Sequence, residues 1–392
     1  MSGRGVLFAN IGAEEGAAAA TAPFRRAVAG LWQLLFRSDA GWLGEDRPPE
    51  PWPEAWGARP EAAVFPWLAD AGASWAWLNS AEAERAVAAA GGVLAGAAPE
   101  VVQRVHDKAF AHAAALEAGL QPPEIADTVV VLDPAALADP DAAVRAIETA
   151  LARWPAPLRR SFTLKPRLGS SGRGRVAGRD GRADCAAVRG ALSRLARQGG
   201  AMLEPWLERS ADLSALLAVG AAGDVTLLGT TRQCLAPSGR YLGNRGTIDS
   251  RGRVTSGDDR DEALREAAGI LAARAAAAGY VGPCGLDAFR FRRGDGEGFR
   301  PAVELNARFT LGHVAIALVR RGLAALVADQ RLRPGDRAAF HFGLDAPAGG
   351  WPELPPACQL HPLWRPGESL RPALVVAPDL AALDDLLGPG GG

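Results

Sequence analysis

Two acidic residues and one asparagine lie on segments that the sequence predicts to be neighbouring strands. The dipeptide Asp295–Gly296 separates the segments and is a strong signal for a two-residue type I′ turn. Counting back from this turn along both strands places Asp287 directly opposite Glu304. Asn306 lies two residues beyond Glu304, so its side chain points to the same face of the sheet.

Two carboxylates that face each other in a sheet repel, at a cost of a few tenths to about 1 kcal/mol. A divalent cation between Asp287 and Glu304 would remove this repulsion, and Mg²⁺ takes carboxylate and amide oxygens as ligands. Two alternatives stay open. The face is simply solvated, or a bulge shifts the register by one residue and sends Asp287 to the other face.

A second candidate is the glycine- and serine-rich segment Gly169–Gly174, which lies between two predicted strands. It lacks the GxxxxGK[ST] pattern and opens no predicted helix, which excludes a P-loop and a dinucleotide-binding turn. It fits a hairpin flap whose backbone N–H groups and serine hydroxyls hold phosphates. Lys165 at its base would add a point charge. An ordinary turn explains the glycines equally well.

Lysine is unusually rare in this chain. The 392 residues include 43 Lys and Arg, of which only Lys108 and Lys165 are lysine. The bias is typical of a GC-rich coding sequence, in which arginine replaces lysine wherever a generic surface charge is enough. A retained lysine therefore indicates a position that needs a compact ammonium group rather than a planar guanidinium.

Taken in order along the chain, five motifs resemble those of the ATP-grasp superfamily. They are Asp107–Lys108 on a helix, the Lys165–Gly174 loop, a strand ending in Glu204–Leu207 with Asp212 after it, Asp287, and the run Glu304-x-Asn306-x-Arg308. The resemblance covers about residues 100–320. The α/β segment before them matches the domain that usually precedes the grasp. No single motif is decisive, but five in this order are a strong signal.

The resemblance implies a role for each matching residue. The residues expected to bind ATP are Lys108, Lys165, Gly169, Ser170, Ser171, Gly172, Gly174, Glu204, Trp206, Leu207 and Asp212. Among them, Glu204–Leu207 would read the adenine edge and Asp212 would contact the ribose, where the usual residue is Glu. The residues expected to bind Mg²⁺ are Asp287, Glu304 and Asn306, with two ions, Glu304 as their bridge, and Mn²⁺ as a possible substitute. Arg308 and Lys165 would act in catalysis on the transferred phosphate.

The activity that the resemblance implies is that of an ATP-dependent carboxylate–amine ligase. Such enzymes convert a carboxylate to an acyl phosphate, join it to an amine, and release ADP and phosphate. A kinase-like phosphotransferase and a non-catalytic nucleotide-binding partner are the alternatives. One departure concerns Gly285, where D-alanine–D-alanine-type ligases have Arg. It speaks against that subfamily and leaves Arg308, Arg232 or Arg245 to stabilise the tetrahedral intermediate.

Composition limits the classes of partner. The formal net charge of −1 argues against nucleic acid or a membrane surface as the partner, so small-molecule carboxylates and amines are expected. Four scattered cysteines and five histidines show no disulfide framework and no metal-binding spacing. Glu14 and Glu15 argue against a signal peptide, and no uninterrupted apolar run reaches about 18 residues. We expect a cytoplasmic protein, with a homodimer as one possible assembly.

The pattern of predicted helices and strands that would position these residues indicates an α/β protein in four parts. Residues 1–98 form a Rossmann-like parallel domain, which opens with strand Gly5–Ala9 and helix Ala22–Arg37. Residues 99–205 form the first lobe of the grasp, in which one helix, Ala98–Ala118, carries Asp107 and Lys108. Residues 206–325 form the second lobe with the metal site. Residues 326–392, rich in Pro, Gly and Arg, are expected to be a weakly patterned extension.

Overall fold

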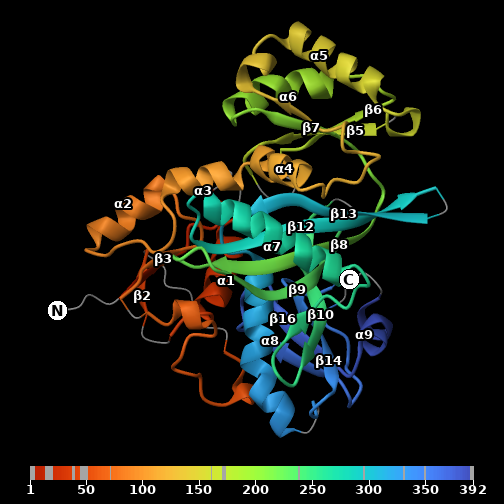
Figure 1. The fold of residues 1–392 in the computed structure, drawn as a ribbon. Coiled ribbons are helices and arrows are strands. Elements are labelled where there is room, and N and C mark those ends of the chain that lie inside the picture. Colours follow the sequence, from red (N-terminus) through yellow and green to blue (C-terminus); the bar gives the residue numbers. More distant parts are fainter. Residues whose placement is uncertain are drawn as a thin grey trace.

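The computed structural model describes residues 5–13, 21–37, 40–44, 52–70, 72–159, 161–169, 174–236, 239–294, 296–329, 332–347 and 350–388. Ser170, Ser171 and Gly172 of the expected flap, and Asp295 of the expected turn, lie outside these ranges. Within the described residues the strands form three sheets of three, four and nine strands (Figure 1). The mixed α/β class expected from the sequence is therefore confirmed.

The N-terminal part is built on the three-stranded parallel sheet, in the order β2-β1-β3. Its elements are β1 (Val6–Phe8), α1 (Ala22–Gln33), β2 (Gly41–Leu43), β3 (Trp75–Ala76) and α2 (Ala81–Ala89), with 3-10 turns η2 (Glu54–Trp56) and η3 (Pro66–Leu68). The N–H of Phe24 is capped by the Thr21 hydroxyl, which fixes where α1 begins. The parallel arrangement agrees with the predicted Rossmann-like opening.

The single helix predicted over Ala98–Ala118 is in fact two helices, α3 (Pro99–His106) and α4 (Lys108–Glu117). They meet at Asp107, whose backbone is extended and whose carboxylate accepts a hydrogen bond from Ala109 N at 2.8 Å. An N-cap residue must leave the helical conformation, and the apolar pattern that continues through the break hides this from the sequence. As a result, Lys108 is the first residue of a new helix.

The four-stranded antiparallel sheet has the order β4-β7-β5-β6 and forms a separate lobe at the top of Figure 1. Its strands are β4 (Val130–Leu132), β5 (Ser161–Pro166), β6 (Val176–Arg179) and β7 (Ala201–Pro205). Its core packs against helices α5 (Pro140–Arg153) and α6 (Ala186–Arg197), with 3-10 turns η4 (Pro134–Leu137) and η5 (Ala156–Leu158) beside them. The sequence also predicts a helix over Pro134–Arg153, but the α-helix begins only at Pro140, because proline fits the first turn of a helix and not its interior.

The nine-stranded sheet is the centre of the molecule, in the order β13-β12-β8-β9-β11-β10-β14-β16-β15. Its strands are β8 (Arg209–Val219), β9 (Val225–Leu235), β10 (Tyr241–Asp249), β11 (Val254–Thr255), β12 (Gly282–Arg293), β13 (Gly296–Asn306), β14 (Arg337–Gly343), β15 (Gln359–Pro362) and β16 (Ala373–Ala377). Helices α7 (Asp261–Ala277), α8 (Leu311–Ala328) and α9 (Leu380–Leu387) pack on it. In Figure 1, α4 lies between this sheet and the four-stranded lobe.

The C-terminal residues do not form the weakly patterned extension expected from the sequence. β14 and β16 pair with β10 and with each other, so they continue the sheet that carries Asp287 and Glu304. Helix α8, which precedes them, was not predicted. It has the length and mean hydropathy of a membrane-spanning helix, but 56% of it is buried inside the protein. Its burial between the sheet and the N-terminal part accounts for its apolar composition.

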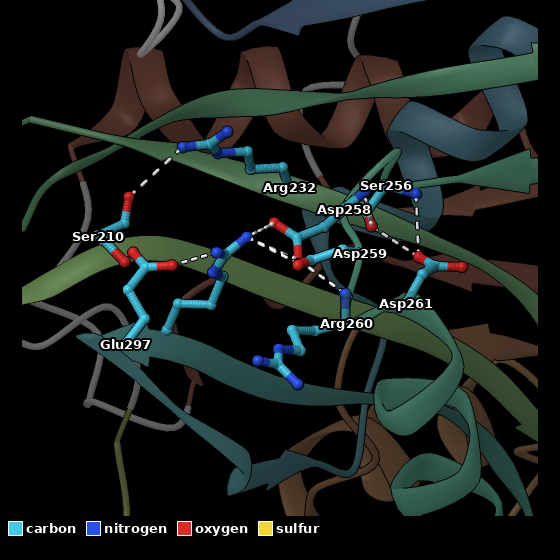
Figure 2. Close-up of polar contacts among 9 residues, drawn as sticks. Ser210, Arg232, Ser256, Asp258, Asp259, Arg260, Asp261 and Glu297 are labelled. Carbon is cyan, nitrogen blue, oxygen red and sulfur yellow. Dashed lines mark hydrogen bonds and ion pairs between the residues drawn. The ribbon is translucent and has the colours of Figure 1, made fainter. Parts of the chain in front are cut away.

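An ionic network fastens the β12–β13 hairpin to the segment that leads into α7 (Figure 2). Arg290 of β12 reaches Asp258 at 3.2 Å and Asp259 at 2.8 Å, and it also pairs with Glu297 of β13. The carboxylate of Asp261 accepts a hydrogen bond from the Ser256 hydroxyl at 2.6 Å. Because Arg290 lies three residues after Asp287, this network restrains the strand that carries the predicted metal ligand.

Candidate functional site

The β12–β13 hairpin places Asp287 directly opposite Glu304, as predicted. The predicted turn is wrong, because Gly296 is already part of β13 and pairs with Arg293. A bulge on β13, opposite the step from Asp287 to Phe289, shifts the register and so corrects for the misplaced turn. The bulge that threatened the pairing is therefore what brings the two carboxylates together.

Amide and ammonium groups surround the two carboxylates. Gln233 Nε2 donates to Asp287 Oδ1 at 2.7 Å, and Asn306 Nδ2 donates to Asp287 Oδ2 at 3.0 Å. Lys108 Nζ lies 3.1 Å from Glu304 Oε2. The three predicted metal-binding residues thus lie together, joined by Gln233 from β9, which sequence reasoning missed. No sequence signal marks Gln233, since only the pairing of β8 with β9 and β12 brings it near.

The electrostatics of the pair fit a cation site. Loss of water contacts and the negative charge of Glu304 raise the pKa of Asp287 to about 7. The same loss of water would raise the pKa of Glu304, but the ammonium groups of Lys108 and Lys165 hold it below its usual range. Two carboxylates that cannot both ionise easily are stabilised by a divalent cation. The oxygens of Asp287, Glu304 and Asn306 are the ligand types that Mg²⁺ takes.

Lys165 on β5 forms an ion pair with Glu204 on β7. Thr163 is the cross-strand partner of Glu204, and Lys165, two residues further, shares its face. On the other side, Arg300 Nη1 lies 2.8 Å from Glu204 Oε2. Burial alone would raise the pKa of Glu204, but Lys165 and Arg300 hold it well below its usual range. Glu204 is thus a buried counter-ion that joins the four-stranded lobe to the nine-stranded sheet.

The start of α4 is attached to the glycine-rich loop. Lys108 Nζ donates to the carbonyl of Gly169 at 2.7 Å, and its backbone N–H donates to the carbonyl of Arg167 at 3.1 Å. Asp107 also pairs with Arg167 at 2.6 Å. Gly169 and Gly174 have φ values of 128° and 70°, which favour glycine. Lys108 therefore contacts both the acidic pair and the base of the expected flap.

Asp107→Ala is expected to lower the free energy of unfolding by about 1 kcal/mol, because it removes the N-cap of α4. If the ATP site implied by the sequence is correct, it should also raise the KM for ATP, because Asp107 holds the start of α4, and with it Lys108, against Arg167. Asp139→Ala is the matched control, since Asp139 caps α5 away from the cleft. Urea unfolding and ADP release would be measured for both. Equal KM values for the two variants would contradict the anchoring role.

The expected nucleotide end contains an aromatic ring that sequence reasoning missed. Arg209 pairs with Asp212 at 2.5 Å, and its guanidinium lies 4.3 Å from the centre of the Phe289 ring. The exposed ring of Trp206 lies under Arg175, at 4.4 Å from its centroid. Phe289 lies two residues after Asp287 on the same strand, a spacing that could have marked it.

Arg308 follows the acidic pair and is buried. Its Nη1 donates to the carbonyl of Phe309 at 2.8 Å and its Nη2 donates to Asn306 Oδ1 at 3.3 Å. The other two arginines considered for the tetrahedral intermediate do not line the cleft. Arg245 pairs with Asp384 at 2.6 Å, and Arg232 donates to the carbonyl of Ser210.

Two histidines near the site support backbone turns. His313 forms a capping box with Thr310 at the start of α8, and burial lowers its pKa to about 4. His106 Nδ1 accepts a hydrogen bond from the N–H of Ala307 at 3.2 Å. Both hold the chain around Arg308 in place.

One cleft of about 910 Å³ connects these groups. The predicted site residues that line it are Lys108, Lys165, Gly169, Asp212, Asp287, Glu304, Asn306 and Arg308. Gly174, Glu204, Trp206 and Leu207 are not among its lining residues. The other polar side chains that line the cleft are Thr21, Arg175, Arg209, Ser214, Gln233, Arg240, Tyr241, Asn244, Thr310, His341 and Asp345. A cleft of this size accommodates a nucleotide together with a small second substrate.

Comparison with known proteins shows similarity in structure alone. No family model and no curated protein matches the sequence. Biotin carboxylase of Campylobacter jejuni, in complex with β,γ-ATP, matches with a TM-score of 0.55 and 14% identity over 98% of this chain and 90% of that one. Carboxyaminoimidazole ribonucleotide synthase of Aspergillus clavatus, complexed with ATP, matches with 0.55 and 15% over 99% and 97%.

The dimeric biotin carboxylase domain of Hydrogenobacter thermophilus 2-oxoglutarate carboxylase is a third match. Its TM-score is 0.54, with 15% identity over 98% of this chain and 90% of that one, and it holds MgADP, ADP and bicarbonate. At such low identity, these likenesses establish a shared fold over nearly the whole chain.

Proposed function

We propose that this chain, which has the fold of the ATP-grasp enzymes, is an ATP-dependent ligase that activates a carboxylate and joins it to an amine. The observation that carries the proposal is the convergence of an opposed carboxylate pair and both lysines of the chain on one cleft. Lysine is retained here at the two positions where a phosphate-rich substrate needs a compact charge.

The nucleotide would lie between the two lobes. Its triphosphate would meet Lys108 and Lys165 beneath the glycine-rich loop, and its ribose would lie near Asp212. The base would lie against Phe289 and the hinge that follows Glu204. The ring of Phe289 and the cations around it suit a flat, polar heterocycle attached to phosphates.

Asp287, Glu304 and Asn306 would hold two Mg²⁺ ions, or Mn²⁺ in their place. When bound, these ions neutralise the charge on the phosphates. The fit rests on the donor set and on the raised pKa of Asp287. Gln233 would keep Asp287 oriented through its hydrogen bond.

The reaction is a phosphoryl transfer followed by an acyl transfer. A carboxylate oxygen attacks the γ-phosphorus, and the bond to the β-phosphate oxygen breaks as ADP leaves. The amine nitrogen then attacks the acyl carbon, phosphate leaves, and the nitrogen loses a proton. Lys165 and Arg308 would stabilise the negative charge on the transferred group, and the protein's main contribution is positioning.

The test is turnover with purified protein, ATP, Mg²⁺ and a panel of carboxylic acids, with hydroxylamine as the nucleophile. We expect ADP, phosphate and a hydroxamate in equal amounts. ADP with a phosphorylated product and no free phosphate would identify a phosphotransferase instead. ATP binding without turnover of any substrate would identify a non-catalytic binding protein.

Removal of divalent cations is expected to stop ADP release, because the phosphates would then face Asp287 and Glu304 without neutralisation. EDTA treatment followed by separate additions of Mg²⁺, Mn²⁺ and Na⁺ tests this, with Na⁺ as the ionic-strength control. Restoration by Mg²⁺ and Mn²⁺ alone is the expected result. Undiminished ADP release in EDTA would contradict the proposed ligand set.

A further inference from the structure

The cleft continues past the acidic pair into a region walled by apolar side chains. We name this region the apolar compartment. The side chains that define it are Ile11, Phe24, Val28, Trp77, Leu235, Leu242, Leu311, Leu344, Pro347 and Leu370. They come from the N-terminal part, from β9 and β10, from the start of α8 and from the C-terminal segment. Four separate parts of the chain thus build a common apolar wall.

Strand pairing fixes where this compartment begins. Leu235 lies two residues after Gln233 on β9, which is about 7 Å along a strand. Gln233 itself donates to Asp287. Leu344 N–H donates to the carbonyl of Leu242 at 2.8 Å, so these two residues are adjacent. The compartment is therefore one step along the sheet from the predicted metal site.

The opposite wall begins beside Arg308. Leu311 is the first residue of α8, three residues after Arg308, and α1 packs against α8. Phe24 and Val28 lie four residues apart on α1, so they share one face of that helix. Arg308 therefore lies at the border between the charged part of the cleft and the apolar compartment.

The polar and charged side chains that line the cleft near the compartment bond within the protein or are exposed. The Tyr241 hydroxyl donates to Asn244, Asn244 Nδ2 donates to Thr231 Oγ1 at 2.8 Å, and Thr310 Oγ1 lies 3.0 Å from His313 Nδ1. The carboxylate of Asp345 accepts hydrogen bonds from the N–H groups of Ala346 at 2.9 Å and Arg371 at 3.0 Å. Arg240 is exposed. Burial and the charge of Arg245 lower the pKa of His341 to about 3, which keeps it neutral. The cations Lys108, Lys165, Arg175 and Arg209 belong to the nucleotide end.

We propose that the apolar compartment binds the non-reacting part of the carboxylic acid substrate, and that this part is an uncharged aliphatic or aromatic group. The inference rests on the proposed function. Arg308 would hold the carboxylate beside the acidic pair, while the rest of the acid lies against Leu242, Leu344 and Phe24. A phosphate or a second carboxylate among these apolar side chains would lose water contacts that the side chains cannot replace.

Hydroxamate formation with a graded series of acids tests this directly. The series runs from acetate to octanoate, with 3-phenylpropanoate, the dicarboxylates of equal length, and bicarbonate. We expect kcat/KM to rise about fourfold for each added methylene until the compartment is full. Each dicarboxylate should react at least about tenfold less efficiently than its monocarboxylate, because its second charge must be buried unpaired.

Variants at Leu242 locate the effect. Leu242→Ala enlarges the compartment and should shift the optimum to a longer chain. Leu242→Asp should reduce kcat/KM for the best monocarboxylate more than about tenfold, with an unchanged KM for ATP. Leu227→Asp is the matched control, because Leu227 is an exposed leucine of β9 that does not line the cleft. It should leave both parameters unchanged.

The outcomes separate the two proposals. Preference for dicarboxylates or bicarbonate, with ADP and hydroxamate still formed, would overturn the apolar substrate and leave the ligase intact. A chain-length optimum that Leu242→Ala does not move would overturn the position of the compartment. Absence of ADP release with every acid would overturn the proposed function, and this inference with it.

Discussion

Replacing Glu304 with glutamine is expected to lower the rate of ADP formation about a thousandfold at saturating ATP. The substitution keeps the size of the side chain and removes the negative charge opposite Asp287. It also takes away the partner of Lys108, 3.1 Å distant. Both the proposed cation and Lys108, the proposed phosphate ligand, would then lose their orientation. A coupled assay for ADP, with thermal unfolding to check that the variant is folded, measures the effect.

Glu297→Gln is the matched control for this substitution. Glu297 lies on the same strand, β13, but pairs with Arg290 in the network near α7 and does not line the cleft. Its replacement should leave ADP formation within about twofold of the original rate, since exposed pairs contribute little. If Glu304→Gln retained turnover similar to that of Glu297→Gln, the assignment of the acidic pair to catalysis would be wrong.

Replacing Glu204 with glutamine is expected to lower the free energy of unfolding by about 3 kcal/mol. The variant would leave Lys165 and Arg300, two like charges, together in a buried place without their shared counter-ion. Because the charges lie on different lobes, the KM for ATP should rise as well. Urea unfolding at neutral pH measures the stability, and ADP release measures the KM.

The stability difference should depend on pH in a definite direction. The pKa of Glu204 is depressed below its ordinary value of 4.5, so its contribution is present above that pH and lost on further acidification. The difference in the free energy of unfolding between the original protein and Glu204→Gln should therefore be constant near neutral pH and decrease in acid. Glu208→Gln, at an exposed pair with Arg292, should cost less than about 1 kcal/mol. Equal losses for the two variants would contradict the buried role of Glu204.

The opposed carboxylates illustrate how far a sequence pattern reaches. The alternation of side chains along two strands and a recognisable turn were enough to pair Asp287 with Glu304. The turn itself was misplaced, and a bulge compensated for the error. Bulges depend on how a strand packs on its neighbours, and an alternating pattern carries no signal for them. The pairing was right although one of its premises was wrong.

The break at Asp107 and the unpredicted elements have different physical causes. The N-cap of α4 depends on the single side chain of Asp107. The apolar pattern continues from α3 into α4, so the sequence gives no sign that the helix is interrupted there. β10 was missed because it contains two glycines, which weaken the signal for a strand. One of them, Gly243, is required, since a Cβ there would lie 2.1 Å from the carbonyl oxygen of Phe342. This glycine is needed because the backbones of β10 and β14 lie close together, and the sequence of β10 alone does not show that contact.

The candidate site was predictable only where its residues follow a motif. Lys108, Lys165 and the acidic pair belong to ordered motifs, and all four line one cleft. Gln233 also lines the cleft but belongs to no such motif, because the pairing of β9 in the sheet brings it to the site. The apolar compartment was also beyond the sequence, because its walls come from both ends of the chain.

The continuity of the large sheet has a consequence for how the chain can be divided. β10 pairs with β14 along seven residues, from Gly243 to Asp249. A fragment that stopped at residue 325 would expose this row of backbone donors and acceptors as an open edge, ready to pair with another copy. Shortening the polypeptide at this border is therefore expected to destabilise the sheet that carries the acidic pair.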